Sequence, residues 1–405
     1  MELDCGQDID LSREEEFFSA LPPRPAVFAI EPKQEGGQVF LSRTVDLRRR
    51  LERLLRPPEP GSKRLNLRAV AARVRYRLTG SPFEQSLSLY QQARELHPRR
   101  YRDFLRLRPP VLLKLNLAGE YPRCYVTRRV LGGNAFYFGP FASRKSADAF
   151  ASEFLNLFKI RRCQIKIRRD PAFPGCIYSE MKMCLAPCFA GCSKEEYDVE
   201  VVRVKEFLAT SGASLIAEFE RERAAASEAL DFERAAAVHK KIEKVAGVLR
   251  GLPDLPRRLE DLNAVVLQLA VEENAIAVFQ IRAVRIADPF LLRFADLQSQ
   301  PRSLEQLLRE QLQSPAADET HEPLVTDRDS RARNQTLEDH LSLLARWFYG
   351  KPRLGEIFFA EAGGSATGGS LTTSWPYRRI IRACSRLLAP PAPSAEAPAP
   401  ASPSS

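Results

Sequence analysis

The chain contains no run of apolar residues that approaches the roughly 18 needed for a membrane-spanning helix. A secretory leader is not expected, because the stretch 1–18 is acidic and does not show a basic region followed by an apolar one. Hydrophobic residues make up 44% of the chain's 405 residues and charged residues 28%, so the chain has enough of both to form a core and a soluble surface. These features predict a globular, cytoplasmic protein whose length favours two or more compact units.

Basic residues outnumber acidic ones by 61 to 51, which gives a formal net charge of +10. The basic residues gather in the first half of the chain, in clusters at 48–56, 73–77, 99–108 and 159–169. One such cluster is commonly the solvated face of a helix, but several together favour a surface that binds phosphates. We therefore expect DNA to be a partner.

Local patterns predict an α+β chain with several domains. Residues 1–20 are typical of a loosely ordered acidic tail, and 351–405 of a loop and a low-complexity tail rich in Pro, Ala and Ser. A β-hairpin is predicted over 27–41 and a helix from its N-cap Asp46 to Leu55. Further strands are expected at 111–117, 123–128, 136–138, 265–269 and 275–281, further helices at 143–158, 195–209, 214–250, 304–313 and 337–349, and a loop at 363–373.

Five of the eight cysteines lie in one short stretch, between Cys163 and Cys192. The first four follow the spacing C-x12-C-x7-C-x3-C and are Cys163, Cys176, Cys184 and Cys188. In a reducing compartment such clustering favours thiolate ligation over disulfides, and both iron-sulfur clusters and structural zinc take four thiolates. The absence of paired CxxC knuckles favours iron-sulfur, with zinc or ordinary buried thiols as the alternatives. Cys192 is expected to be a spectator.

Three segments, Tyr137–Phe141, Leu157–Cys163 and Cys184–Cys188, resemble the region behind the nuclease domain of the UvrC family. This family is the incision subunit of bacterial nucleotide excision repair, and the resemblance extends over roughly 25–349. It implies that the four cysteines hold a 4Fe-4S cluster. It also implies a degenerate GIY-YIG α/β domain over 21–105, a Cys-cluster region over 106–200, a UVR helical hairpin over 201–252 and a further α/β segment over 259–350.

The stretch Leu230–Ala236 resembles the UVR motif, a two-helix hairpin through which the family docks on UvrB. A break near Leu230–Asp231 in the helical pattern is consistent with such a hairpin. The resemblance implies a partner-binding role for Phe232, Glu233, Ala235 and Ala236. We expect Phe232, Ala235, Val238 and Ile242 to form one apolar stripe. The alternative is an ordinary intramolecular helical pair.

The GIY-YIG resemblance identifies nuclease positions, most of which lack their functional group. Phe28 and Phe40 stand where the family has catalytic tyrosines, and Leu89 or Tyr90 stands where it has a metal-binding glutamate. Hydrolysis needs a phenol to help activate water and a carboxylate to hold a divalent metal, so such a metal is not expected to bind well here. Arg102 likewise replaces an asparagine.

One catalytic position is retained, because Arg50 matches the family's arginine and could still bind phosphate. Together these positions predict an inactive nuclease fold that binds DNA through Arg43, Arg48, Arg49 and Arg50. The alternatives are an active single-incision excinuclease that uses Glu84 or Glu95, and a pure interaction protein. The family's second, RNase H-like incision domain is not expected in the residues after 349.

Overall fold

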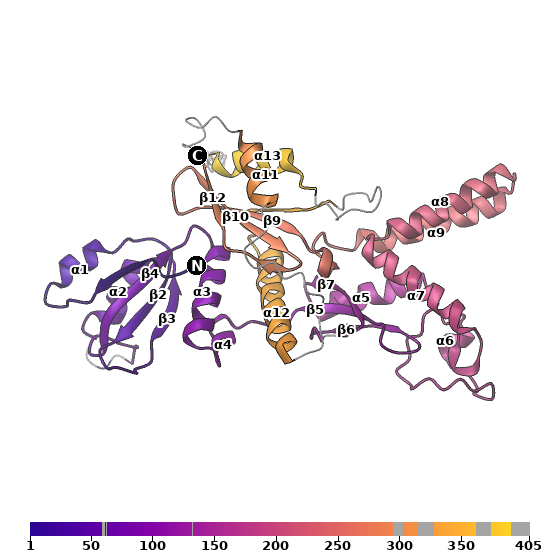
Figure 1. Ribbon diagram of the computed structural model, residues 1–405, viewed down its shortest axis with the longest axis horizontal. Coiled ribbons are helices and arrows are strands. Elements are labelled where there is room, and N and C mark those ends of the chain that lie inside the picture. Colours follow the sequence, from indigo (N-terminus) through magenta and orange to yellow (C-terminus); the bar gives the residue numbers. More distant parts are fainter. Residues whose placement is uncertain are drawn as a thin grey trace, which may run out of the picture.

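The computed structural model describes residues 1–58, 61, 63–131, 133–294, 303–313, 328–361 and 374–389, without the side chains of 328–331. These residues form three antiparallel sheets flanked by helices (Figure 1). The expected α+β class is confirmed. In this part of the chain, no helix is both long enough and apolar enough to cross a membrane.

The N-terminal sheet has the strand order β1-β4-β2-β3. Its elements are β1 (Cys5–Asp8), α1 (Glu14–Ala20), β2 (Ala26–Pro32), β3 (Phe40–Thr44), α2 (Leu47–Leu55), β4 (Ala71–Leu78), α3 (Pro82–Leu96) and α4 (Tyr101–Leu105). The predicted hairpin is confirmed, since β2 pairs with β3, and Gly36 in their connection has a φ of 75° that favours glycine. Helix α2 begins after Asp46 as predicted, because the Asp46 carboxylate accepts the Arg49 N–H.

The expectation that residues 1–20 are loosely ordered is wrong. Strand β1 pairs with β4, and α1 packs against the sheet with Phe17 and Phe18 buried. The acidic side chains of α1 lie in its first turn, where carboxylates interact favourably with the helix dipole. The two phenylalanines bury enough apolar surface to hold the segment against α2 and the sheet.

The middle sheet has the strand order β6-β5-β7-β8. Its elements are β5 (Val111–Asn116), β6 (Arg123–Thr127), β7 (Ala135–Phe141), α5 (Arg144–Leu155), α7 (Lys194–Ala209) and β8 (Arg257–Arg258), with a 3-10 turn at Leu259–Asp261. The three predicted strands and the predicted helix are confirmed, although α5 ends before the predicted residue 158. Stacked aromatic rings of Phe150, Phe154 and Phe207 join α5 to α7 in one core.

Two antiparallel helices, α8 (Ala213–Glu228) and α9 (Phe232–Arg250), project away from the rest of the protein (Figure 1). The predicted break is confirmed between them, and the Asp231 carboxylate caps α9 by accepting the Arg234 N–H. Only the base of this pair joins the middle core, through Leu215, Val245 and Val248.

The third sheet has the order β11-β10-β9-β13, with β12 also paired to β10. Its elements are β9 (Ala264–Leu269), β10 (Ala275–Arg282), β11 (Arg285–Ile286), β12 (Phe290–Arg293), α11 (Leu304–Gln313), α12 (Arg328–Tyr349), β13 (Glu356–Phe359) and α13 (Tyr377–Leu388). Side chains alternate between its faces, as period-2 patterning requires. One face packs with α11 and α13, and the other packs with α12 and α3.

The expectation that residues 351–405 are all loop and tail is wrong, because β13 and α13 lie within them. Strand β13 pairs with β9, and α13 buries Ile380, Ala383 and Cys384 against the sheet. The predicted loop at 363–373 and the tail from 390 onward lie outside the described residues.

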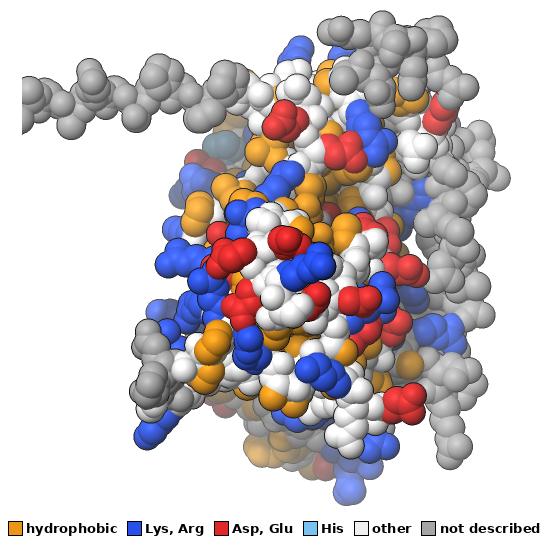
Figure 2. Space-filling model, turned by 90° about the vertical axis from the view of Figure 1, so that its left-hand side faces the viewer, with side chains coloured by type: hydrophobic (Ala, Val, Ile, Leu, Met, Phe, Trp, Pro, Cys, Tyr) orange, Lys and Arg blue, Asp and Glu red, His pale blue; other side chains and the backbone are white. Residues whose placement is uncertain are grey.

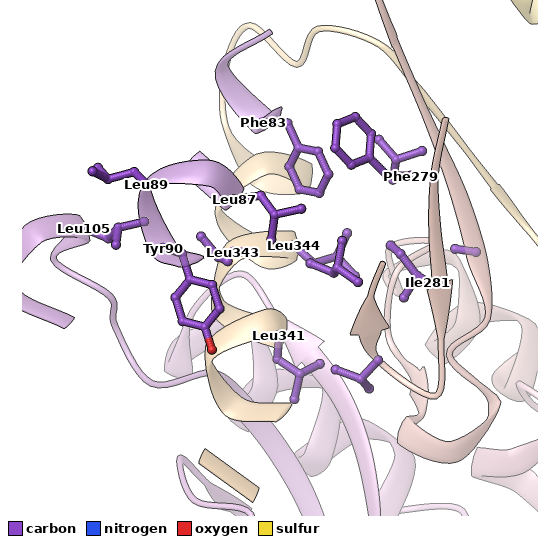
Figure 3. Packing of buried hydrophobic residues seen from close by; sticks show 14 of the residues in the cluster. Phe83, Leu87, Leu89, Tyr90, Leu105, Phe279, Ile281, Leu341, Leu343 and Leu344 are labelled. Atoms are coloured by element: carbon purple, nitrogen blue, oxygen red, sulfur yellow. The ribbon is translucent and has the colours of Figure 1, made fainter. Parts of the chain in front are cut away.

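The N-terminal domain is packed directly on the third sheet. Phe83 and Leu87 of α3 point between β10 and α12, where Phe83 meets Phe279 edge to face (Figure 3). Gly80 allows the close approach, since a Cβ there would lie 2.4 Å from the backbone of Ala270. The position of this domain is therefore fixed by a continuous apolar core.

Candidate functional site

The four clustered cysteines lie in an irregular segment between α5 and α7. This segment contains only short helical turns, α6 (Ile177–Glu180) and a 3-10 turn at Pro187–Phe189. Cys188 is buried, and Cys163, Cys176 and Cys184 are half-buried. Helix α6 buries none of its own residues, so apolar packing contributes little to the shape of this part of the segment.

The four thiols lie near one another. Burial, together with the neighbouring thiols Cys163, Cys176 and Cys188, raises the pKa of Cys184 to about 11. The Ala186 N–H acts in the opposite direction, because it donates to Cys184 Sγ at 3.3 Å and so stabilises a thiolate. Among the described residues, no three His, Cys, Asp or Glu side chains are arranged to hold a single ion.

Hydrogen bonds tie the start of the cysteine segment to the middle domain. Tyr197 of α7 donates its hydroxyl to Pro122 O at 2.7 Å and accepts the Arg161 N–H at 3.0 Å. The Lys159 N–H donates to the Glu200 carboxylate, which also pairs with Arg203. Burial raises the pKa of Tyr197 well above its ordinary range, so the phenol keeps its proton for this bond.

The remaining cysteines are separate from this group of four. Cys124 belongs to the middle core and Cys384 to the core beneath α13. Cys5 is exposed on β1. Cys192 is buried close to the group, and its carbonyl accepts a hydrogen bond from Arg169 at 3.0 Å. Cys192 therefore provides a control position for substitutions of the four clustered cysteines.

The positions aligned with nuclease residues do not all share one face of the N-terminal sheet. Phe28 is fully buried and lies 6.2 Å from the Phe40 ring, on the face covered by α1 and α2. Leu89 and Tyr90 of α3 belong to the core on the opposite face. Glu84 is buried at the start of α3, where its carboxylate accepts the Gly80 N–H at 2.8 Å and burial raises its pKa.

The predicted DNA-binding arginines differ in their surroundings. Arg43 and Arg49 are exposed, and Arg50 is half-buried. Arg48 donates to the carbonyls of Leu21 and Ser19 at 2.8 and 2.9 Å, so part of its guanidinium holds α1 to α2. In the view of the N-terminal end in Figure 2, Lys and Arg side chains gather along one side, and acidic and apolar side chains occupy the middle.

A further arginine extends this basic region, and sequence reasoning missed it. Burial lowers the pKa of Arg346 on α12, and the nearby charges of Arg43 and Arg108 lower it further. Arg346 is held in place by a hydrogen bond to Arg106 O at 2.8 Å. The packing of α12 against the N-terminal domain thus brings together arginines from distant parts of the chain.

Arg102, which replaces a family asparagine, and its neighbour Tyr101 form a buried polar contact with α12. Tyr101 donates its hydroxyl to Asp339 at 2.6 Å, and Arg102 pairs with the same carboxylate at 2.7 Å. Gln335 donates to the Tyr101 oxygen at 2.8 Å, and the Tyr90 hydroxyl lies 3.5 Å from Asp339. Asp339 is only 2% exposed on its side chain, so these partners offset the cost of burying its charge.

The helical pair ends in an apolar tip. Leu230 and Phe232 are 72% and 68% exposed. Val238 is buried against α8, whereas Ala235 and Ile242 are half-buried, so Phe232 stands apart from the predicted stripe. Glu233 and Ala236 are exposed. An exposed aromatic ring at the end of a projecting element is typical of a surface that binds a partner.

Comparisons with known proteins agree with this architecture. Residues 111–207 match the UvrC/Cho excinuclease middle domain. UvrABC system protein C of Oleidesulfovibrio alaskensis is 29% identical over 279 residues, which cover 67% of this chain and 39% of that protein. The corresponding protein of Syntrophomonas wolfei is 27% identical, with coverages of 69% and 46%, and that of Ruminiclostridium cellulolyticum is 31% identical, with coverages of 43% and 28%.

The chain spans less than half the length of these relatives. No solved structure matches it. The matched residues contain β5, β6, β7, α5, the cysteine segment and nearly all of α7. The chain is similar to UvrABC system protein C over about two-thirds of its length, in agreement with the family that its motifs predict.

Proposed function

We propose that this protein acts in nucleotide excision repair by binding DNA and a UvrB-type partner without cutting DNA. The observation that carries the proposal is a match to the UvrC/Cho middle domain, and the sequence resemblance predicts that Phe28 and Phe40 of the preceding sheet stand where the family has its nuclease tyrosines. A phenylalanine retains the packing of a tyrosine ring and removes the oxygen that would transfer a proton. The fold can thus persist without the chemistry.

The surroundings of Glu84 argue against the alternative of an active single-incision nuclease. Its carboxylate is buried and already accepts the Gly80 N–H, whereas a magnesium ligand must present its oxygens to the ion. Incubating the protein with damaged duplex and Mg²⁺ or Mn²⁺, with and without UvrB, should give no incision. Metal-dependent incision that Arg50→Ala abolishes would refute the proposal.

We expect DNA binding to depend on the exposed arginines of the N-terminal domain. Replacing both Arg43 and Arg49 by alanine should lower the affinity for duplex DNA and reduce the slope of log K against log salt by about 2, roughly one unit per lost phosphate contact. Fluorescence anisotropy at several salt concentrations measures both quantities. The paired substitution of Arg221 and Lys240, which are exposed on the helical pair, is the control and should leave the slope unchanged.

We further propose that the tip of the helical pair contacts the UvrB-type partner. Phe232→Ala should weaken binding to UvrB by tenfold or more, because an exposed aromatic anchor commonly contributes about 2 kcal/mol or more to an interface. The melting temperature of the Phe232→Ala variant should equal that of wild type, since the ring makes little contact within the chain. Val199→Ala is the matched control, because Val199 is also an exposed apolar residue on a helix, with 61% of its surface accessible. Equal binding by both variants would contradict this role.

We also propose that the four cysteines hold an iron-sulfur cluster, because four neighbouring thiols have the donor chemistry that such a cluster requires. Cys163, Cys176, Cys184 and Cys188 supply four thiolates, and the Ala186 N–H already donates to Cys184 Sγ as a hydrogen bond to a cluster ligand would. When bound, such a cluster would serve as a covalent cross-link of the segment. Because Tyr197 and Glu200 tie one end of the segment to α7, it would fix the path of the chain from the DNA-binding domain to the helical pair.

A further inference from the structure

A second basic site lies at the base of the helical pair, away from the cysteines and from the basic clusters of the first half of the chain. It is a cavity of about 540 Å³ between the residues that follow α9, the end of α12, strand β13 and the start of α13. This volume is within the range of pockets that bind nucleotide-sized ligands. Arg257, Arg353 and Arg379, from three separate parts of the chain, line it together with Phe348, Phe358 and Phe359.

Each of the three guanidinium groups lies over an aromatic ring. The Arg257 Cζ is 3.4 Å from the centroid of Phe359, and the Arg353 Cζ is 4.8 Å from that of Phe348. The Arg379 Cζ is 5.9 Å from the centroid of Phe358. Such contacts restrain the planar group through its face, while the N–H donors at its edge remain directed outward.

None of these three arginines forms an ion pair with a carboxylate of the described residues, in contrast to Arg258 and Arg386 beside them. Arg257 donates to the carbonyls of Asp254 and Leu255, which leaves other N–H groups of its five without a protein acceptor in this part of the chain. Burial lowers the pKa of Arg257 to about 10, because removing the guanidinium from water disfavours its charged form. A bound anion would offset this desolvation free energy. Asp254 and Glu361 also line the cavity, and the arginines leave it a net positive charge.

We propose that this cavity binds a phosphate group carried on a nucleotide, either free or within a single strand of DNA. Guanidinium groups without a carboxylate partner among the described residues are available to phosphate oxygens, whose geometry they match. The guanidinium planes that lie over these rings supply flat faces on which a base can stack, and stacking of this kind is how proteins bind single strands without regard to sequence. The site lies beside the base of the partner-binding helices, so a strand held there would stay close to the partner.

The test compares the double variant Arg353→Gln/Arg379→Gln with wild type. Both arginines are exposed, so the substitutions should leave the melting temperature unchanged. Binding of dAMP is measured by calorimetry, and binding of a short fluorescein-labelled oligothymidylate by anisotropy at several salt concentrations. Arg378→Gln is the matched control, because Arg378 is the exposed neighbour of Arg379 on α13 and does not line the cavity.

We expect the double variant to bind at least one of the two probes tenfold or more weakly than wild type, and the control to bind both normally. A loss with oligothymidylate, accompanied by a fall in salt slope of about 2, assigns the site to a DNA strand. A loss confined to dAMP assigns it to a free nucleotide. Unchanged binding in the double variant, or no binding of either probe by wild type, overturns the proposal. The dAMP result does not depend on DNA binding by the N-terminal domain, so it is separate from the proposed function.

Discussion

Cys184→Ser is expected to abolish binding of the proposed iron-sulfur cluster and the visible absorption that would accompany it. Wild-type protein purified without oxygen should contain about four irons and a similar amount of sulfide per chain. Serine keeps the size of the side chain but replaces the thiolate, the ligand that iron-sulfur clusters require. Metal and sulfide analysis with an ultraviolet-visible spectrum measures the outcome.

The same variant should become sensitive to proteolysis between residues 163 and 188, because this segment has little other means of holding its shape. Helix α6 buries no residue, and three residues near the cysteines, Lys182, Ala186 and Ala190, have positive φ values of 56°, 58° and 61° that cost free energy in a non-glycine residue. The aromatic core of α5 and α7 should remain folded, since it does not include the four cysteines.

Cys192→Ser is the control for both measurements. Cys192 is buried in the same segment but lies outside the group of four, so its variant should retain iron and resist the protease as wild type does. Stoichiometric zinc in the wild type would contradict an iron-sulfur cluster while retaining the four ligands. Absence of any metal in freshly purified wild-type protein would contradict the site itself.

Much of the fold could be predicted from local sequence. The strands of the middle domain alternate or are continuously apolar, and Asp46 and Ser143 mark helix starts through hydrogen bonds to residues three positions later. The cysteine group and the break between α8 and α9 also have short-range signatures. These features depend on residues that are neighbours in sequence, which is why the sequence indicates them.

The features that were missed depend on contacts between distant residues. Strand β13 is short and becomes a strand only by pairing with β9, and β1 only by pairing with β4. The contact of Tyr101 with Asp339 joins residues that are 238 positions apart. Arg257, Arg353 and Arg379 are unremarkable one at a time, and only the fold brings them to one cavity. No local period or spacing carries that information.

Acidification should weaken the contact between α3, α12 and the third sheet through one residue, His340. Its side chain is nearly fully buried, and burial lowers its pKa from 6.5 to about 4. The nearby charges of Arg94 and Arg285 act in the same direction. A shift of this size corresponds to about 3 kcal/mol of stability that is present at pH 7.

The sign follows from which state binds the proton. In the unfolded chain His340 becomes protonated as the pH falls through about 6.5, whereas in the folded protein it stays neutral until about pH 4. Its contribution is therefore complete above pH 6.5 and is lost as the pH falls to about 4. The neutral ring is favoured in the folded protein because its Nδ1 accepts the Ile286 N–H at 3.0 Å. A proton on Nδ1 would turn this acceptor into a donor that faces another N–H donor.

His340→Asn tests this contribution, because the asparagine amide oxygen can accept the Ile286 N–H in place of Nδ1 and does not titrate. The variant should be less stable than wild type at pH 7, where it loses ring packing against Tyr90, and this difference should shrink by about 3 kcal/mol at pH 4. The free energy of unfolding is measured by urea unfolding, followed by the fluorescence of Trp347, whose ring lies 5.3 Å from that of Phe83 in this interface. His239→Asn, at an exposed position on α9, should leave the pH dependence of wild type intact.

A difference between His340→Asn and wild type that stays constant from pH 7 to pH 4 would contradict the role of this histidine. If the expected loss is found, it has a consequence for DNA binding. Arg43 belongs to the N-terminal domain and Arg346 to α12, so their proximity depends on the interface that His340 occupies. The affinity of wild type for duplex DNA should then fall at pH values where the interface opens, although the arginines themselves keep their charge.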